Sequence, residues 1–204
     1  MNRFASVLTA LLLAAVGLSG CNVLPARAPP PQLHDFGTLP AAMPGSTGLV
    51  RVDRVAAPAW SDDGAVHYRL AYADPTALRS YADQRWAAPP SDMLHLRLQA
   101  LLGGDGSRAA APQPVRLLSV ELLEFEQDFP AARQASVLLV AQASLRDALD
   151  GQVLGQRQFL LSAPSTPDVQ GAVRDLSKLA QQAAEQMAAW SAGIEPPAAQ
   201  GSRP

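Results

Sequence analysis

The segment that decides the fold is 136–161, with the sequence SVLLVAQASLRDALDGQVLGQRQFLL. Apolar and polar residues alternate over its first part, 136–147, and this alternation is typical of a strand with one buried face. Asp150-Gly151 then matches a type I′ turn, because that turn needs positive φ angles. We therefore expect 153–161 to pair back antiparallel onto the first strand. The expected buried row of the first strand comprises Val137, Leu139, Ala141, Ala143 and Leu145.

Five further strands are expected upstream of this hairpin, at 33–37, 49–55, 66–72, 78–86 and 115–125. Apolar residues alternate with polar ones in several of them, and aromatic side chains in others suit a pleated sheet. Turn residues separate the strands, among them Asp62-Asp63-Gly64 and Asp74-Pro75.

A helix is expected from Pro90 to Leu102. Ser91 or Asp92 is placed to cap the free N–H groups at its start, and Gly103 is placed to end it. The leucines of this segment also alternate with polar residues, so a strand is the alternative. The capping residues, the length and the glycine stop favour the helix.

A second helix is expected from Pro167 to Ser191, with Thr166 as its cap and Pro167 in the first helical position. Apolar residues recur along it at spacings of three and four, which forms a continuous stripe. The stripe is either a coiled-coil seam or a face packed on the protein's own sheet, and the small Ala180 and Ala183 favour the sheet. Its members are Val169, Val173, Leu176, Ala180, Ala183, Met187 and Trp190.

These elements predict a single α/β domain with a mixed, largely antiparallel sheet of six or seven strands, packed by the two helices. The chain has 204 residues, of which 48% are hydrophobic. A domain of this size buries enough surface to fold without a disulfide or a structural metal.

The N-terminus has the layout of a bacterial lipoprotein signal. Arg3 precedes an apolar run over 4–16, and small residues then lead to the only cysteine in the sequence Leu18-Ser19-Gly20-Cys21. The apolar run is shorter than the roughly 18–20 residues that a membrane-spanning helix needs. We expect cleavage before Cys21 and acylation of Cys21, which anchors the mature chain in a membrane. An ordinary secretory signal that ends near a cysteine is the alternative.

Cleavage there divides the chain into a signal peptide (1–20), a proline-rich tether (21–32), the α/β domain (33–193) and a disordered tail (194–204). Prolines favour extended geometry at about 3.1 Å per residue, so the tether spans roughly 30 Å. Asn22 follows the cysteine, whereas an aspartate there would resemble the inner-membrane retention signal of enteric lipoproteins. We therefore expect an outer-membrane protein that faces the periplasm of a Gram-negative bacterium.

The composition argues against several classes of function. A formal net charge of −2 provides no basic footprint for nucleic acid. Once Cys21 is acylated, no thiol remains for a disulfide, a zinc site or a nucleophile. His34, His67 and His95 lie far apart, without the spacing of metal ligands.

Catalytic motifs are also missing, since the chain has neither a phosphate loop nor a Gly-x-Ser-x-Gly elbow. Glu121, Glu124 and Glu126 crowd one strand end, and we interpret them as a solvated strand edge rather than as paired catalytic carboxylates. We predict no catalytic residue, no metal and no cofactor, and therefore no enzyme.

Several short motifs follow one another in the middle of the chain: Tyr68-Arg69, residues 78–81, Arg85-Trp86, Pro89-Pro90 and Met93-Leu94. In this order they resemble the auxiliary lipoprotein family of ABC-type transporters. Later hydrophobic patterns at 118–126 and 135–147 are similar to the family's next strands. The specific feature is the order of these patterns behind a lipoprotein signal. The motif positions carried over are Tyr68, Arg69, Tyr81, Trp86, Pro90 and Leu94.

The resemblance implies a role in intermembrane lipid transport. It implies a mixed α/β domain that docks on a periplasmic protein of the mammalian-cell-entry type, which works with an inner-membrane ABC permease and ATPase. It implies no catalysis by this chain. Tyr81 and Trp86 are then either core aromatics that anchor the sheet to the first helix or part of a docking or lipid-handling surface.

Two alternative functions stay open on the sequence alone, and so does the oligomeric state. The chain could be a structural assembly lipoprotein of an outer-membrane complex. It could be a hydrolytic lipoprotein, which a buried His–acid pair would support. A homo-oligomer is compatible with every one of these functions.

Overall fold

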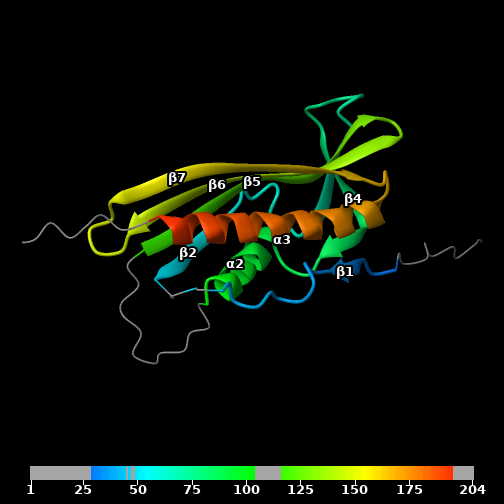
Figure 1. The fold of residues 1–204 in the computed structure, drawn as a ribbon. Helices are drawn as coiled ribbons and strands as arrows, with labels where there is room; N and C mark the ends of the chain where they lie inside the picture. The colour runs from blue at the N-terminus through cyan, green and yellow to red at the C-terminus, as the bar shows by residue number, and fades with distance from the viewer. Residues whose placement is uncertain (1–28, 45, 47–48, 104–115, 195–204) are drawn as a thin grey trace, which may run out of the picture. The chain divides into compact units, whose positions relative to one another are not determined.

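A seven-stranded mixed sheet carries helices α2 and α3 on one of its faces (Figure 1). The computed structural model describes residues 29–44, 46, 49–103 and 116–194. The predicted signal peptide, Cys21, most of the predicted tether and nearly all of the predicted tail lie outside the described residues. The description below concerns the unit that begins at Pro31.

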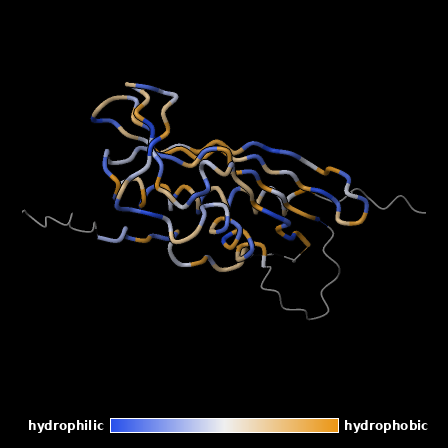
Figure 2. The backbone as a smooth tube through the Cα atoms, turned by 180° about the vertical axis from the view of Figure 1, so that it is seen from behind, coloured by the Kyte–Doolittle hydropathy of each residue, from blue (hydrophilic) through white to orange (hydrophobic). Residues whose placement is uncertain are grey.

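Three long antiparallel strands form the body of the sheet: β5 (Arg116–Ala131), β6 (Gln134–Asp147) and β7 (Val153–Ser165). Buried and more exposed side chains alternate over much of β5 and β6, which places one row of each strand on the helices and the other row on the opposite face. Figure 2 shows that the sheet contains both hydrophobic and hydrophilic positions. The predicted row of β6 is confirmed, since each of its five side chains has 0% exposure: Val137, Leu139, Ala141, Ala143 and Leu145.

The other strands are arranged around β5. Strand β2 (Val50–Ala56) pairs in parallel with the first part of β5, and β3 (Ala65–Arg69) pairs in parallel with its far part at Gln127 and Asp128. One edge of β5 is therefore shared by two strands, while β6 takes the other edge. Strand β4 (Leu78–Trp86) is antiparallel to β3, and the short β1 (Gln32–His34) is parallel to β4. The predicted fold class, a single α/β domain with a mixed sheet and two helices, is confirmed.

Both helices pack on the sheet and on each other. Helix α2 (Pro90–Leu101) buries leucines at 94, 98 and 101, so the helix interpretation of this segment is confirmed over the strand. Helix α3 (Val169–Gly193) buries the centre of its predicted stripe, with Leu176, Ala183 and Met187 at 0% exposure. The stripe therefore packs on the protein's own sheet. None of the helices in the described part of the chain has the length and hydropathy to cross a bilayer.

The helix boundaries correct two predicted caps. No side chain of its own caps α2; instead the Asp62 carboxylate accepts hydrogen bonds from the backbone N–H and the hydroxyl of Ser91, at 3.2 and 2.5 Å. Helix α3 begins at Val169 rather than Pro167, because Asp168, and not Thr166, accepts the Gly171 N–H at 2.7 Å. α2 ends one residue before the predicted Leu102, and α3 continues two residues past the predicted Ser191.

The predicted type I′ turn is wrong. The hairpin closes with the Asp147 N–H donating to Gln152 O at 2.8 Å, which leaves a four-residue turn in which Gly151 has φ 74°. The carboxylates of Asp147 and Asp150 each accept a backbone N–H two residues further on, at 2.7 and 2.8 Å. These bonds stabilise a wider turn than the dipeptide alone predicts.

Leu176→Asp is predicted to unfold the protein or make it insoluble, because it places a carboxylate in the fully buried contact between α3 and the sheet. Burial of a leucine contributes about 1.5–3 kcal/mol, and a buried unpaired charge adds a further cost. Circular dichroism and the soluble yield measure the effect. Gln182→Asp, at an exposed position of the same helix, is the control and should stay folded. A soluble, folded Leu176→Asp protein would contradict the packing described here.

Candidate binding groove on the open sheet face

The motif residues predicted from the sequence lie in two clusters on the helix side of the sheet and in one ion pair. Trp86 packs against Phe36 and Phe125, with ring centroids 5.3 and 5.7 Å away. Pro90 and Leu94 are buried at the start of α2, in the same part of the core. This cluster joins β4, β5 and the first helix.

Tyr81 belongs to a second cluster, which is connected through Gln127 to the residues just before α3. Its ring lies 4.6 Å from that of Tyr68, and its hydroxyl donates to Gln127 Oε1 at 2.7 Å. The Gln127 amide is fully buried and donates in turn to Ser165 Oγ and Thr166 O, at 3.1 and 2.8 Å. Burial raises the pKa of Tyr81 to about 12. A chain of hydrogen bonds thus connects β4, β5 and the entry to α3.

Arg69 forms a bidentate ion pair with Glu126. Arg69 Nε and Nη2 donate to the two carboxylate oxygens at 2.7 and 3.1 Å. The hydrogen bond to Glu126 raises the pKa of Arg69. Glu126 is only 4% exposed, so its assignment to a solvated strand edge is wrong. A bulge between Leu122 and Glu124 shifts the register of β5, and β3 then covers this end of the strand.

The lipobox residues and the histidines named in the sequence analysis do not form a site in the described part of the chain. Leu18, Ser19, Gly20 and Cys21 lie outside the described residues. Each histidine has its own surroundings; His34 bonds Gln84 at 2.5 Å and His67 bonds Asp63 at 3.1 Å. Among the residues that the structure describes, no three His, Cys, Asp or Glu side chains are grouped to hold a metal ion.

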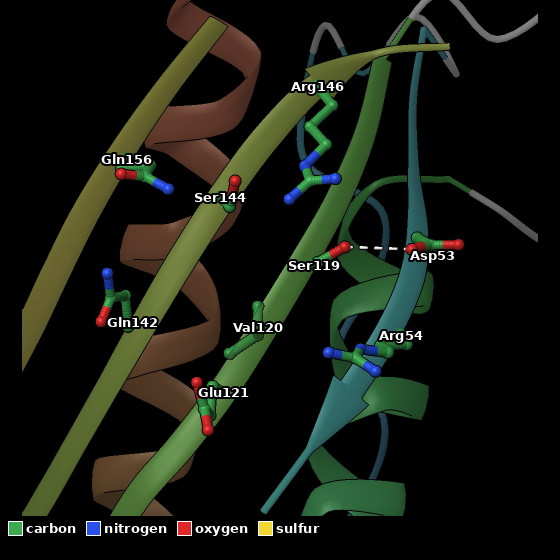
Figure 3. A pocket seen from close by; sticks show the side chains of 9 residues that line it. All are labelled: Asp53, Arg54, Ser119, Val120, Glu121, Gln142, Ser144, Arg146 and Gln156. Atoms are coloured by element: carbon green, nitrogen blue, oxygen red, sulfur yellow. Dashed lines mark hydrogen bonds between the residues drawn. The ribbon is translucent and has the colours of Figure 1, made fainter. Parts of the chain in front are cut away.

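The face of the sheet opposite the helices bears a polar groove of about 350 Å³ (Figure 3). Its central row crosses four strands, because the register pairs Arg54 with Ser119, Ser119 with Ser144, and Ser144 with Gln156. The same alternation that sends the apolar row of each strand to the helices sends these side chains outward. Sequence reasoning missed the groove, since outward polar positions were evident but the neighbours of each strand were not.

The groove contains two cations that lack anionic partners. In Figure 3 the side chains of Arg54 and Arg146 extend toward β5 from opposite sides. Neither guanidinium lies within 4.0 Å of a carboxylate in the described part of the chain. Asp53 accepts the Ser119 hydroxyl at 3.0 Å, and Glu121 lies further along β5.

The floor of the groove holds an unpaired hydroxyl. Ser144 Oγ is shielded from solvent and has no hydrogen-bond partner within the described residues. Buried polar atoms are nearly always paired in folded proteins, so an unpaired hydroxyl at this position is unusual. The arrangement suits recognition of an oxyanion by hydrogen bonds and charge.

A family model described as "ABC-type transport auxiliary lipoprotein component" matches residues 32–188. The chain belongs to this family. The match runs from β1 into the last turns of α3, so it includes the whole sheet and both helices. No curated protein matches the chain.

Two solved structures share the fold of this auxiliary lipoprotein. The crystal structure of protein XCC0632 from Xanthomonas campestris has a TM-score of 0.66 and 19% sequence identity, over 78% of this chain and 94% of that one. The crystal structure of an uncharacterized protein has a TM-score of 0.60 and 18% identity, over 79% and 99% of the two chains. The family assignment makes the protein a lipoprotein of the cell envelope associated with ABC-type transport.

Tyr81→Phe is predicted to destabilise the auxiliary lipoprotein by about 1–3 kcal/mol at pH 7, since it leaves the buried Gln127 Oε1 unpaired. The pKa of Tyr81 is about 12 in the folded protein against 10.0 for a free tyrosine, so the folded state holds its proton more tightly. Its contribution is complete below pH 10 and is lost as the pH rises toward 12. Urea unfolding of both proteins at pH 7, 10 and 11.5 should show the difference shrinking with pH; a constant difference would contradict this role.

Proposed function

We propose that the protein is a lipid-anchored periplasmic accessory component of an ABC transport system of the mammalian-cell-entry type, which moves lipid between the two membranes. It acts as an adaptor that docks on the periplasmic partner and carries out no catalysis. The observation that carries this proposal is the family match over residues 32–188, which spans the complete sheet and both helices.

The anchor is Cys21, which carries a diacylglycerol thioether and an acylated N-terminal amine after removal of residues 1–20, with palmitate among its acyl chains. Strand β1 begins at Gln32, so a tether of ten residues, 22–31, separates the anchor from the sheet. At about 3.1 Å per residue in extended geometry, the tether holds the domain up to roughly 30 Å from the bilayer. Asn22 in place of an aspartate supports the outer membrane as the anchoring membrane.

The adaptor role is supported by the surfaces that the fold leaves free. The apolar stripe of α3 is already occupied by the sheet, so it is not available as a partner seam. The opposite face of the sheet is open and polar, as are many transient protein interfaces.

Copurification tests the proposal. The acylated protein, extracted gently from envelopes, should bring with it a mammalian-cell-entry-type protein, and mass spectrometry should show a mature N-terminus at an acylated Cys21. Cys21→Ala is the control and should keep its leader and carry no acyl chains. Repeated failure of a correctly acylated protein to retain such a partner would contradict the adaptor role.

Deletion of the gene separates this function from the alternative of a structural assembly lipoprotein. Loss of a transport accessory should alter the lipid asymmetry of the outer membrane. Loss of an assembly factor should instead lower the abundance of an outer-membrane complex, and that result with unchanged lipid asymmetry would contradict the proposal.

A further inference from the structure

The polar groove is lined by both positive and negative side chains, as a binding site for a zwitterion would be. Arg54 and Arg146 supply two guanidinium groups without anionic partners in the described chain, and each can donate paired hydrogen bonds to a phosphate. In Figure 3 Ser119, whose hydroxyl donates to Asp53, lies between the two guanidinium groups, and Ser144 lies to one side of them on β6. An anion held between the two arginines would receive charge-assisted hydrogen bonds from both of them.

The same groove also offers a negative charge. Glu121 lies two residues from Ser119 along β5 and pairs with Gln142 in the next row of the sheet. Rows on one face of a strand are about 7 Å apart. Two arginines and two carboxylates, Asp53 and Glu121, make the groove neutral as a whole, so a bare polyanion is not its best charge complement.

A phosphate and a primary ammonium joined by a short linker match this layout. The phosphate would lie between the arginines over Ser119, and the ammonium would lie against the Glu121 carboxylate one row away. We propose that the groove binds a phosphoethanolamine group. That chemistry is shared by the headgroup of an ethanolamine phospholipid and by soluble glycerophosphoethanolamine.

Headgroup binding is tested on the purified protein alone, so its result is separate from that of copurification with a transport partner. A failure of one measurement leaves the other unaffected.

Isothermal titration calorimetry of the full-length protein in a maltoside detergent provides the test. Glycerophosphoethanolamine should bind at least tenfold more tightly than inorganic phosphate. It should also bind more tightly than glycerophosphocholine, whose quaternary ammonium cannot donate a hydrogen bond to Glu121. Equal affinity for all three, or no binding of glycerophosphoethanolamine, would overturn the proposal.

Variants locate the site. The double variant Arg54→Gln, Arg146→Gln should lose at least tenfold in affinity, and Glu121→Gln should remove the preference for glycerophosphoethanolamine over inorganic phosphate. Arg157→Gln is the matched control and should bind as the wild type does, because Arg157 stacks on Phe159, 4.9 Å from its ring, outside the groove. Wild-type affinity in a double variant with an unchanged circular dichroism spectrum would overturn the assignment.

A final comparison identifies the source of the group. Dihexanoylphosphatidylethanolamine, used below its micelle concentration, carries the same headgroup on short acyl chains. If it binds at least as tightly as glycerophosphoethanolamine, the ligand is a lipid headgroup. If only glycerophosphoethanolamine binds, the ligand is the soluble form, and if neither binds the proposal is wrong.

Discussion

The structure depends on the packing of α3 across the long strands, mainly β6 and β7, and on hydrogen bonds that fasten both ends of the helix to β5. The stretch of β5 from Arg116 to Gln127 covers about 36 Å at the usual strand rise. Helix α3 has 25 residues, which corresponds to about 37 Å. Gln127 donates to Thr166 O just before the helix, and Arg116 donates to Ser191 O and Ile194 O at its end.

The side chains that bond the two ends of α3, Gln127 and Arg116, differ in the free energy that their burial costs. Gln127 is neutral, and its amide satisfies a backbone carbonyl and a hydroxyl inside the core. Arg116 is a buried cation, and burial lowers the pKa of its guanidinium. The negative end of the helix dipole and the free carbonyls of the last turn offset that cost. Between these ends, the apolar rows of the strands and the helix form the core, and the buried Arg97 of α2 donates to Gln181 of α3 and to Phe36 O.

Periodicity made much of this arrangement predictable. The alternation in β6 and the three-and-four spacing in α3 report local geometry, and both survive in the folded protein because the same residues also form the core. The register of the sheet, by contrast, has no local signal in the sequence. Arg69 and Glu126 are 57 positions apart, and nothing in either local pattern indicates that β3 lies beside the far end of β5. The sequence therefore predicts a solvated edge at Glu126, whereas the side chain is buried in the ion pair.

The candidate site illustrates the same limit. Its residues come from four strands, and the central row exists only because β2 pairs in parallel with β5 next to the hairpin. The sequence indicates that Ser119 and Ser144 face away from the core, but it contains no local signal that Arg54 joins them. The motif residues of the resemblance, by contrast, were found from the sequence. They lie in the aromatic core, in the Gln127 network and in the buried ion pair, so in this chain they belong to the scaffold.

In this account both helices belong to the protein's own core, and partners and ligands meet the open face of the sheet. Amide hydrogen exchange of the full-length protein, followed by mass spectrometry, tests this claim most directly. The account predicts that peptides from β5, β6 and α3 exchange equally slowly, at the rate set by global unfolding. Fast exchange of α3 beside a protected β6 would contradict it, because the helix would then be separable from the sheet and free to bind a partner.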